Sequence, residues 1–236
     1  FIKYPYHMIL GFPVIVNLRR VMSYKDAGDL VSKIKGLYVI LDDQFLKGRN
    51  MVDLAYSILS GGASVIQIRD KKNDKGDILD NSIRIRDICE SHGALLIIND
   101  HVDLAVASGA HGVHLGQHDL PIDISRQILL PNQLIGTSNA LLNEASESIR
   151  TGADYIAVGA IFPTKTKNNT RPAGLNTLSN ICRISSVPVV AIGGIDKSNA
   201  REVIEAGADS VCVVSAVLGS HDPESAARDI VTVISE

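Results

Sequence analysis

Five short polar clusters stand out in this chain because each one directly follows a short apolar, β-branched run. The clusters are Gln67–Lys71, Asn99–Asp100, Gly116–Asp119, Thr164–Lys167 and Gly193–Gly194. In parallel α/β folds, the carboxyl ends of the strands and the loops after them converge on one face, where chemistry takes place. We therefore expect the five clusters to line one site.

The first cluster places two cations at the spacing of a β-strand. In an extended chain, Gln67, Arg69 and Lys71 point one way, and Ile68 and Asp70 point the other way. A guanidinium can grip a diphosphate through paired hydrogen bonds, and an ammonium acts as a point charge. We predict that Arg69 and Lys71 bind a diphosphate. The alternative is a solvated strand end.

Two carboxylates follow the next two apolar runs. Asp100 comes directly after Asn99, and Asp119 comes after Gly116-Gln117-His118, so the two could meet across adjacent strands. With only oxygen ligands on offer, the natural ion is Mg²⁺ held in part by water and by a substrate diphosphate. The alternative role for each aspartate is to cap the helix that follows it.

Zinc is a competing interpretation, because His111, His114 and His118 lie close together in the sequence. Strand geometry argues against a shared site. Positions 111 and 114 have opposite parity along a strand, and position 118 lies in the following loop. We expect each histidine to be packed or exposed without a metal.

Two later groups of residues predict a second anion site. Thr164–Lys167 supplies hydroxyls and basic groups, and the chain stays polar up to Arg171, as in a loop that closes over an anion. Gly193–Gly194 and Val214–Ser215 follow two later apolar runs, where many barrels bind phosphate through backbone amides. We predict one phosphate monoester here. A charged loop without a ligand is the alternative for the first group.

A regular pattern positions these clusters from residue 37 onward. Apolar β-branched runs alternate with segments of helical periodicity at intervals of roughly 20 to 25 residues. The predicted strands are 37–41, 64–68, 94–98, 111–115, 134–137, 154–160, 187–192 and 210–214, and the predicted helices are 50–60, 77–91, 102–108, 122–129, 142–150, 175–184, 197–206 and 223–235. Eight such units without a long linker favour a single (β/α)₈ TIM barrel over an open doubly wound sheet.

The N-terminal part departs from this pattern. We assign residues 1–36 to an N-terminal extension with a leading helix, and residues 37–236 to the barrel, which is the catalytic domain. The apolar run Met8–Val16 is too short to span a bilayer, which needs about 20 residues, and no small-residue cleavage site follows it. Two interpretations stay open: a secretion signal, or translation that begins at Met22.

Composition narrows the classes of partner. The chain has 236 residues, 45% of them apolar, and a net charge of −3, which suits one barrel-sized domain. With 23 basic and 26 acidic residues, it has no general attraction for nucleic acid or an anionic membrane. Cys89, Cys182 and Cys212 lack close C-x-x-C spacing, which favours reduced thiols in a cytoplasmic protein. We expect small-molecule partners, no nucleic acid and no membrane, and a homo-oligomer stays open.

In order, the motifs resemble those of thiamine-phosphate synthase. They are Q-x-R-x-K after the second predicted strand, I-N-D after the third, G-V-H-L-G-Q-x-D after the fourth, G-x-S at Gly136–Ser138, F-P-T-x-T-K after the sixth and I-G-G-I after the seventh. The resemblance runs from about residue 37 to about residue 220. The apolar N-terminal extension and the polar insert Asn168-Asn169-Thr170 differ from the family pattern.

The resemblance implies a role for each matching position. An aminopyrimidine diphosphate would be held by Gln67, Ile68, Arg69, Asp70, Lys71, Asn99, Ser138 and Lys167, and a thiazole phosphate by Thr164, Thr166, Gly194, Val214 and Ser215. Lys165 would also bind substrate. Asp100 and Asp119 would bind Mg²⁺. Arg69, Lys71, Ser138 and Lys167 would be the catalytic residues.

The implied reaction joins 4-amino-2-methyl-5-(diphosphooxymethyl)pyrimidine to 4-methyl-5-(2-phosphooxyethyl)thiazole and releases pyrophosphate. A dissociative route is expected, because the 4-amino group stabilises the cation that remains when the diphosphate departs. The protein then needs charge stabilisation and orientation rather than a nucleophile.

Two alternatives share this barrel. A thiazole tautomerase would use a histidine as a proton shuttle and would need no diphosphate site. A silent thiazole-phosphate-binding barrel should have lost a contact to the leaving group. The complete set of Arg69, Lys71, Asp100, Asp119 and Lys167 argues against both.

Overall fold

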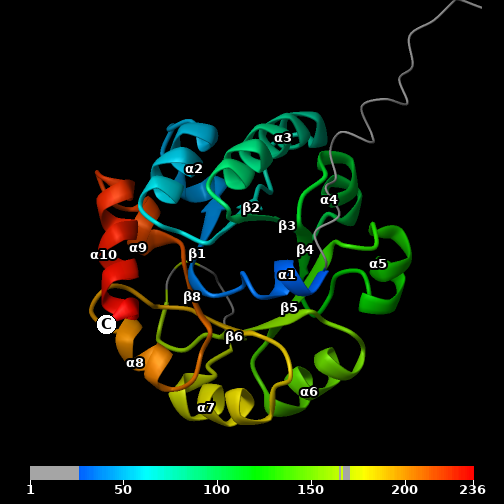
Figure 1. Cartoon of the computed structure of the whole chain (residues 1–236), viewed down its shortest axis with the longest axis vertical. Coiled ribbons are helices and arrows are strands. Elements are labelled where there is room, and N and C mark those ends of the chain that lie inside the picture. The colour runs from blue at the N-terminus through cyan, green and yellow to red at the C-terminus, as the bar shows by residue number, and fades with distance from the viewer. Residues whose placement is uncertain (1–26, 165, 167–170) are drawn as a thin grey trace, which may run out of the picture.

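Eight parallel strands form a closed ring surrounded by helices in the computed structural model of this chain (Figure 1). The structure describes residues 27–164, 166 and 171–236. The expectations about the extension before residue 27, about Lys165 and Lys167, and about the insert at 168–170 lie outside these residues. Neighbours in the ring are neighbours in sequence, and β1 pairs with β8 to close it, so the predicted TIM barrel is confirmed.

Every predicted strand is present, with its ends moved by at most two residues. The strands are β1 (Gly36–Asp42), β2 (Val65–Arg69), β3 (Leu95–Asn99), β4 (Gly112–Leu115), β5 (Leu134–Asn139), β6 (Tyr155–Gly159), β7 (Val189–Ile192) and β8 (Ser210–Val213). The eight predicted helices are present as well, as α2 (Met51–Ser60), α3 (Lys75–Ser91), α4 (Val102–Ser108), α5 (Ile122–Ile128), α6 (Leu142–Arg150), α7 (Gly174–Ile184), α8 (Ala200–Glu205) and α10 (Pro223–Ser235).

Three short elements complete the described chain. They are α1 (Ala27–Val31), the 3₁₀ turn η2 (Asp43–Phe45) and α9 (Ser215–Leu218). Elements η2 and α9 span three and four residues, which is too short to show a helical period in the sequence. Both follow strands that end at the face where the polar clusters meet.

Alternating side chains along the strands divide the apolar interior into two cores. Residues such as Val39, Ile66 and Ile68 point outward and pack beneath the helices. Residues such as Tyr38 and Tyr155 point inward and fill the ring. This division follows from the period of two along a strand, and it leaves every second position available to the barrel interior.

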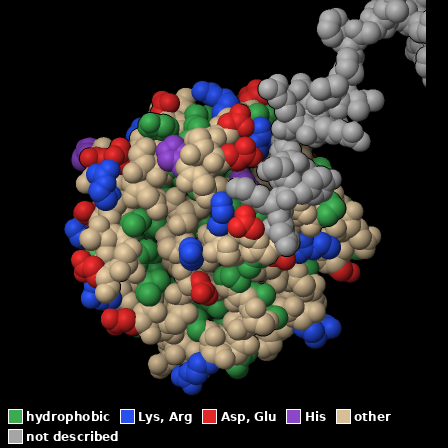
Figure 2. Space-filling view, viewed as in Figure 1, with side chains coloured by type: hydrophobic (Ala, Val, Ile, Leu, Met, Phe, Trp, Pro, Cys, Tyr) green, Lys and Arg blue, Asp and Glu red, His purple; other side chains and the backbone are tan. Residues whose placement is uncertain are grey.

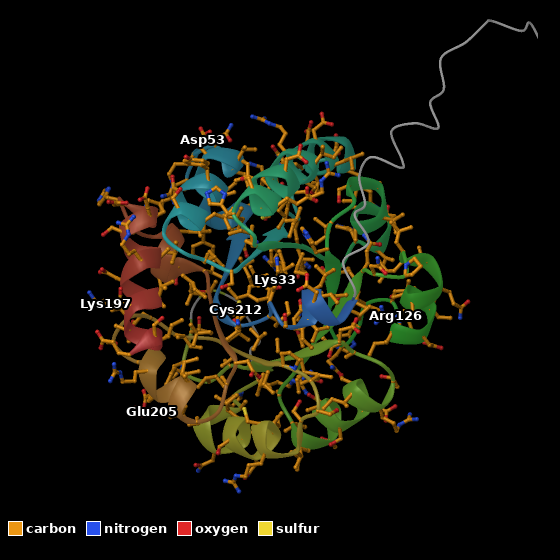
Figure 3. The ribbon with its side chains drawn as sticks, in the orientation of Figure 1. Lys33, Asp53, Arg126, Lys197, Glu205 and Cys212 are labelled. Atoms are coloured by element: carbon orange, nitrogen blue, oxygen red, sulfur yellow. The ribbon has the colours of Figure 1, made fainter. Side chains whose placement is uncertain are left out.

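Helix α1 crosses the amino-terminal opening of the ring (Figure 1). Leu30 and Ile34 are buried in the inner core, and Lys33 Nζ donates to the carbonyl of Gly93, 2.9 Å away. Figure 3 places Lys33 and Cys212 inside the outline of the ring in this projection. The segment from α1 to β1 therefore plugs the end of the barrel opposite to the polar clusters.

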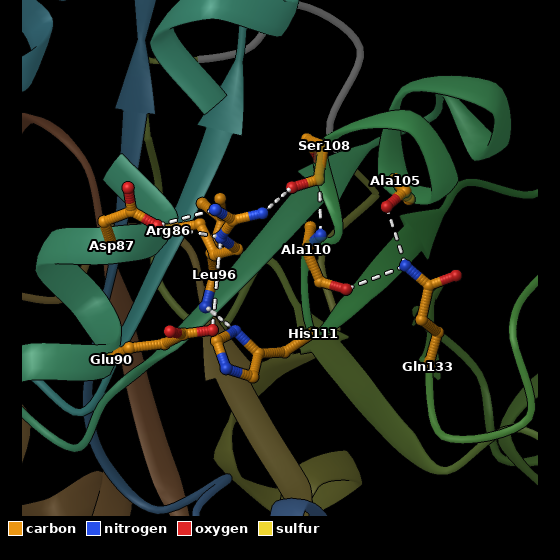
Figure 4. A network of polar contacts seen from close by, with 9 residues as sticks. All are labelled: Arg86, Asp87, Glu90, Leu96, Ala105, Ser108, Ala110, His111 and Gln133. Carbon is orange, nitrogen blue, oxygen red and sulfur yellow. Dashed lines mark hydrogen bonds and ion pairs between the residues drawn. The ribbon is translucent and has the colours of Figure 1, made fainter. Parts of the chain in front are cut away.

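Polar contacts fasten the loops at the amino ends of β3, β4 and β5 (Figure 4). Arg86 donates to the carbonyl of Ser108 at 2.7 Å, and the Gln133 amide donates to two carbonyls at 2.7 and 2.8 Å. His111 Nδ1 accepts from the backbone N–H of Leu96 at 3.0 Å. In barrels of this type, such contacts at the amino-terminal face serve stability, and His111 takes part in them.

The outer surface carries charges of both signs. Acidic and basic side chains are interspersed over the face that shows α1 (Figure 2), which agrees with the small net charge of the chain. Among the described residues, no helix is long and apolar enough to cross a membrane.

Candidate active site

A cavity of about 600 Å³ opens at the carboxyl ends of the strands. Its walls come from β1, β2 and β5 to β8 and from the loops after them. The predicted site residues that line it are Arg69, Ser138, Thr164, Thr166, Gly194, Val214 and Ser215. The remaining predicted residues within the described chain, which are not among its lining, are Gln67, Ile68, Asp70, Lys71, Asn99, Asp100 and Asp119.

Arg69 reaches the cavity from the end of β2 and is held by a residue that the sequence analysis missed. Its guanidinium lies 2.6 Å from Oδ2 of Asp42, at the end of β1, whose side chain is only 4% exposed. The other oxygen of Asp42 accepts from the N–H of Gln44 and caps the start of η2. Asp42 follows the apolar run of β1 as the other clusters follow theirs, so the same signal could have identified it.

Lys71, Asp100 and Asp119 form an acidic cluster with one cation beside the β2 wall. Lys71 Nζ lies 3.2 Å from Oδ2 of Asp100. Burial raises the pKa of Asp119, a hydrogen bond with Asp100 and the negative charge of Asp100 raise it further, and the N–H of Gly116 and the charge of Lys71 oppose the shift. The structure thus brings together the two carboxylates that were expected to meet across adjacent strands.

Neither aspartate serves as a helix cap. Helix α4 begins after His101 and α5 begins after Pro121. Asp119 instead accepts the N–H of Gly116 at 2.6 Å, and Asp100 takes a backbone φ of +63°. No group of three or more His, Cys, Asp or Glu side chains that could hold a metal occurs in residues 27–164, 166 and 171–236. A cation here would have to take its remaining ligands from water or substrate.

Three other members of the first cluster do not line the cavity. Ile68 packs in the outer core. Burial alone would raise the pKa of Asp70, but hydrogen bonds from Asn73 and from the N–H of Lys72 lower it overall. Through these hydrogen bonds the Asp70 carboxylate holds its own loop in place. Gln67 is buried and donates from Nε2 to the hydroxyl of Tyr38 at 2.6 Å. Their predicted contacts with substrate remain predictions.

A chain of buried hydrogen bonds leads from Gln67 to the cavity. The hydroxyls of Tyr38 and Tyr155 lie 3.1 Å apart, and the Tyr155 hydroxyl lies 3.0 Å from Nδ1 of His114. The other ring nitrogen of His114 lies 3.0 Å from Oγ of Ser138, which lines the cavity. Burial raises the pKa of Tyr155, and it raises the pKa of Tyr38 with help from the neighbouring Tyr155.

The opposite wall is built by the ends of β6, β7 and β8. Gly194 has a φ of +66°, and a Cβ there would lie 2.6 Å from the carbonyl of Pro163. Within the β6 loop, the hydroxyl of Thr164 accepts from the N–H of Thr166 at 3.2 Å. Val214 precedes α9, whose first residue is Ser215. Glycine at position 194 thus lets the β6 and β7 loops meet.

Arg171 is a second cavity residue that the sequence analysis did not assign to the site. Its guanidinium forms a hydrogen-bonded ion pair with Glu144, at the start of α6, with one N–O distance of 3.1 Å. Burial alone would raise the pKa of Glu144, but the hydrogen bond and the charge of Arg171 lower it overall. The backbone carbonyl of Arg171 also accepts the N–H of Ala160. These contacts fasten the chain where it returns to the barrel.

Comparisons with known proteins agree with the resemblance seen in the sequence. Residues 37–217 match the sequence model of the family described as thiamine monophosphate synthase. The chain is 45% identical over 195 residues to thiamine-phosphate synthase of Methanoculleus marisnigri, covering 82% of this chain and 92% of the relative. It is 39% identical over 201 residues to that of Shouchella clausii, covering 85% and 96%.

A solved structure agrees as well. The fold superposes on thiamine phosphate pyrophosphorylase from Pyrococcus furiosus with a TM-score of 0.80 and 39% identity, covering 87% of this chain and 98% of the other.

Proposed function

The chain belongs to the thiamine-phosphate synthase family, whose members are transferases, and from this premise we propose its substrates, its metal and the roles of its residues. It joins 4-amino-2-methyl-5-(diphosphooxymethyl)pyrimidine to 4-methyl-5-(2-phosphooxyethyl)thiazole, giving thiamine phosphate and pyrophosphate. The observation that supports this most directly is the make-up of the site. Arg69 lines the cavity and is followed two residues later by Lys71, which pairs with Asp100 in the acidic cluster, and a glycine-rich wall at Gly193–Gly194 also lines the cavity.

The acidic pair fits a magnesium ion. Asp100 and Asp119 lie close enough for the charge of one to raise the pKa of the other, and a divalent cation would remove that repulsion. Both offer oxygen, the ligand that Mg²⁺ prefers, and two protein carboxylates leave room for water and diphosphate oxygens. When bound, the ion neutralises negative charge on the departing diphosphate.

The first half of the reaction is departure of the diphosphate. The bond between the pyrimidine methylene carbon and the diphosphate oxygen breaks, and the oxygen leaves with the electron pair. Arg69 binds the leaving group through its guanidinium, which Asp42 holds in place at 2.6 Å. Lys71 adds a second positive charge from two residues further along, and the predicted role of Lys167 is the same.

The second half is attack by the thiazole. Its ring nitrogen donates a lone pair to the methylene carbon, and a carbon–nitrogen bond forms. The thiazole phosphate is held by the hydroxyls of Thr164 and Thr166 and by backbone N–H groups of Gly194, Val214 and Ser215, all of which line the cavity. Holding both substrates in one cavity gives the nitrogen the required orientation.

The test is formation of thiamine phosphate from the two purified substrates, measured by fluorescence after oxidation to thiochrome phosphate. We expect product only with magnesium, and at least about 100-fold less from Asp100→Ala, because one metal ligand is lost. Asp103→Ala is the matched control, since this nearby aspartate is exposed on α4 and pairs with Lys75. Folded wild-type protein that binds the thiazole phosphate and forms no product would contradict the proposal.

A further inference from the structure

We propose that a buried hydrogen-bond relay makes the Ser138 hydroxyl a hydrogen-bond donor into the cavity, aimed at an acceptor atom of the pyrimidine diphosphate. The relay runs through Gln67, Tyr38, Tyr155 and His114, which are positioning residues because they act through Ser138. This inference rests on the proposed function for its substrate, but the direction of the relay can be tested without activity.

The direction is set at the buried end. The amide nitrogen of Gln67 can only donate, and it lies 2.6 Å from the hydroxyl of Tyr38. Burial raises the pKa of both tyrosines, so each phenol keeps its single proton. Because Tyr38 accepts from Gln67, its own proton is directed to the oxygen of Tyr155, 3.1 Å away.

The same logic carries the direction to the cavity. Tyr155 accepts from Tyr38 and therefore donates to Nδ1 of His114, 3.0 Å away. A neutral imidazole whose Nδ1 accepts carries its proton on Nε2, and this nitrogen lies 3.0 Å from Oγ of Ser138. Ser138 therefore accepts from His114, and its own proton points away from the ring, toward the cavity that it lines.

The barrel interior holds the relay rigidly. Both tyrosine rings are almost fully buried in the inner core. A Cβ at position 136 would lie 1.9 Å from the Tyr155 ring, so only a glycine at this position of β5 leaves room for the ring. The side-chain amide of Gln117 donates to the Ser138 carbonyl at 2.6 Å and fastens the backbone of the residue that receives the relay.

A preset donor suits this reaction. Negative charge grows on the diphosphate as it departs, and a hydroxyl that already points its proton into the cavity needs no reorientation at that moment. A freely rotating Ser138 hydroxyl would instead turn its lone pairs toward the diphosphate for part of the time. The relay therefore gives a functional reason for two buried tyrosine hydroxyls that packing alone does not require.

The first experiment reads the tautomer of His114 directly. Long-range ¹H–¹⁵N correlation spectra of protein labelled at its seven histidines, assigned with His114→Gln, report which ring nitrogen carries the proton. We expect the Nε2-protonated form in the wild type and a mixture of tautomers in Tyr155→Phe, which keeps the ring and removes the hydroxyl. A wild-type His114 protonated on Nδ1 overturns the relay.

The second experiment is a double-mutant cycle on product formation. We expect Tyr155→Phe to lower kcat by about 5- to 10-fold and Ser138→Ala by at least as much, while the double variant matches Ser138→Ala alone. A merely structural role of Tyr155 would lower the double variant further. Tyr56→Phe is the matched control, because Tyr56 is exposed on α2.

The outcomes separate the relay from the proposed function. If Ser138→Ala lowers kcat and Tyr155→Phe does not, the relay is wrong and the proposed function stands. If the two effects simply multiply, Tyr155 does not act through Ser138 and the relay is wrong. If the wild type forms no thiamine phosphate, the proposed function is wrong, and the tautomer of His114 still decides the direction of the relay.

Discussion

At the scale of single residues, the close approach of Asp100 and Asp119 destabilises the chain when no cation is bound. The folded state raises the pKa of Asp119 above its unfolded value. The protonated form therefore contributes stability below the unfolded pKa, and this contribution is lost as the pH rises through the folded pKa. At neutral pH the pair therefore lowers the stability of the fold, and the proposed magnesium ion would offset this loss.

Replacing one carboxylate should separate these two effects. We expect Asp119→Asn to leave the free energy of unfolding of the metal-free protein at neutral pH unchanged, or to raise it by no more than about 1 kcal/mol. The melting temperature should change in the same direction. Asparagine can still accept the N–H of Gly116. The increase in melting temperature on adding magnesium should disappear. An Asp119→Asn variant that magnesium stabilises as much as the wild type contradicts the assigned metal site.

Magnesium binding should also depend on pH in a defined direction. The ion needs Asp119 without its proton, so protons compete with the metal as the pH falls toward the raised pKa of this residue. We expect the magnesium-induced rise in melting temperature to be full near neutral pH and to shrink steadily in acid. Thermal melts over a series of buffered pH values, with and without magnesium, measure this. An effect that stays constant in acid would place the ion elsewhere.

At the scale of elements, the site depends on close contact between loops that follow neighbouring strands. Gly194, after β7, lies against the β6 loop, where a Cβ would come 2.6 Å from the Pro163 carbonyl and 2.8 Å from Cβ of Phe162. The loop that carries Thr164 and Thr166 thus rests on a backbone without a side chain. The geometry of the predicted thiazole-phosphate site depends on this contact.

The substitution Gly194→Ala tests that dependence. We expect a loss of about 1 to 3 kcal/mol in free energy of unfolding, and a larger rise in KM for the thiazole phosphate than for the pyrimidine diphosphate. Gly48→Ala is the matched control, because Gly48 also has a positive φ, +79°, but nothing lies within 4 Å of its Cβ position. Chemical denaturation and steady-state kinetics measure both quantities. Equal KM changes for the two substrates would contradict the assigned wall.

The elements were largely predictable from the sequence, because alternation and helical periodicity are local signals. The outward direction of Ile68 and the approach of Asp100 to Asp119 followed from strand parity and strand order. The partner of Arg69 was missed, although Asp42 ends an apolar run in the same way as the predicted clusters. Arg171 and α9 were also missed, since an ion pair across 27 residues and a four-residue helix leave no periodic signal.

The interior of the ring was the least predictable part. Tyr38 and Tyr155 lie 117 residues apart in sequence, and their hydroxyls meet only because opposite strands of a closed barrel face each other. In the sequence, each is one aromatic residue inside an apolar run, as expected for core packing. His114 was considered as a metal ligand and expected instead to be packed or exposed, but its place in a hydrogen-bonded chain was not predicted.

At the scale of the whole molecule, the barrel separates a closed end from a reactive end. Helix α1 and the residues after it plug the amino-terminal opening with Leu30 and Ile34, while the cavity opens at the carboxyl ends. Substitutions in the plug should therefore affect stability and spare substrate binding.

A pair of isoleucines tests this separation. We expect Ile34→Ala to lower the free energy of unfolding by about 2 to 5 kcal/mol, because Ile34 is 1% exposed and leaves a cavity in the inner core. The KM for either substrate should stay within about twofold at temperatures where the variant is folded. Ile184→Ala, at an exposed position on α7, should change neither quantity. A large KM change in folded Ile34→Ala would show that the two ends are coupled.

Closure of the ring between β1 and β8 also fixes the order in which the site can come into existence during synthesis. The register joins Gly36 to Ser210, and Ser210 Oγ donates to the carbonyl of Gly36 across 174 residues of chain. While the ribosome is still making the segments between them, β1 has an open edge that could pair with another nascent chain. Asp42 ends β1 and Ser215 follows β8. These two residues come to line one cavity only when β8 pairs with β1. A ribosome-bound intermediate that lacks β8 therefore has an exposed strand edge and no complete active site.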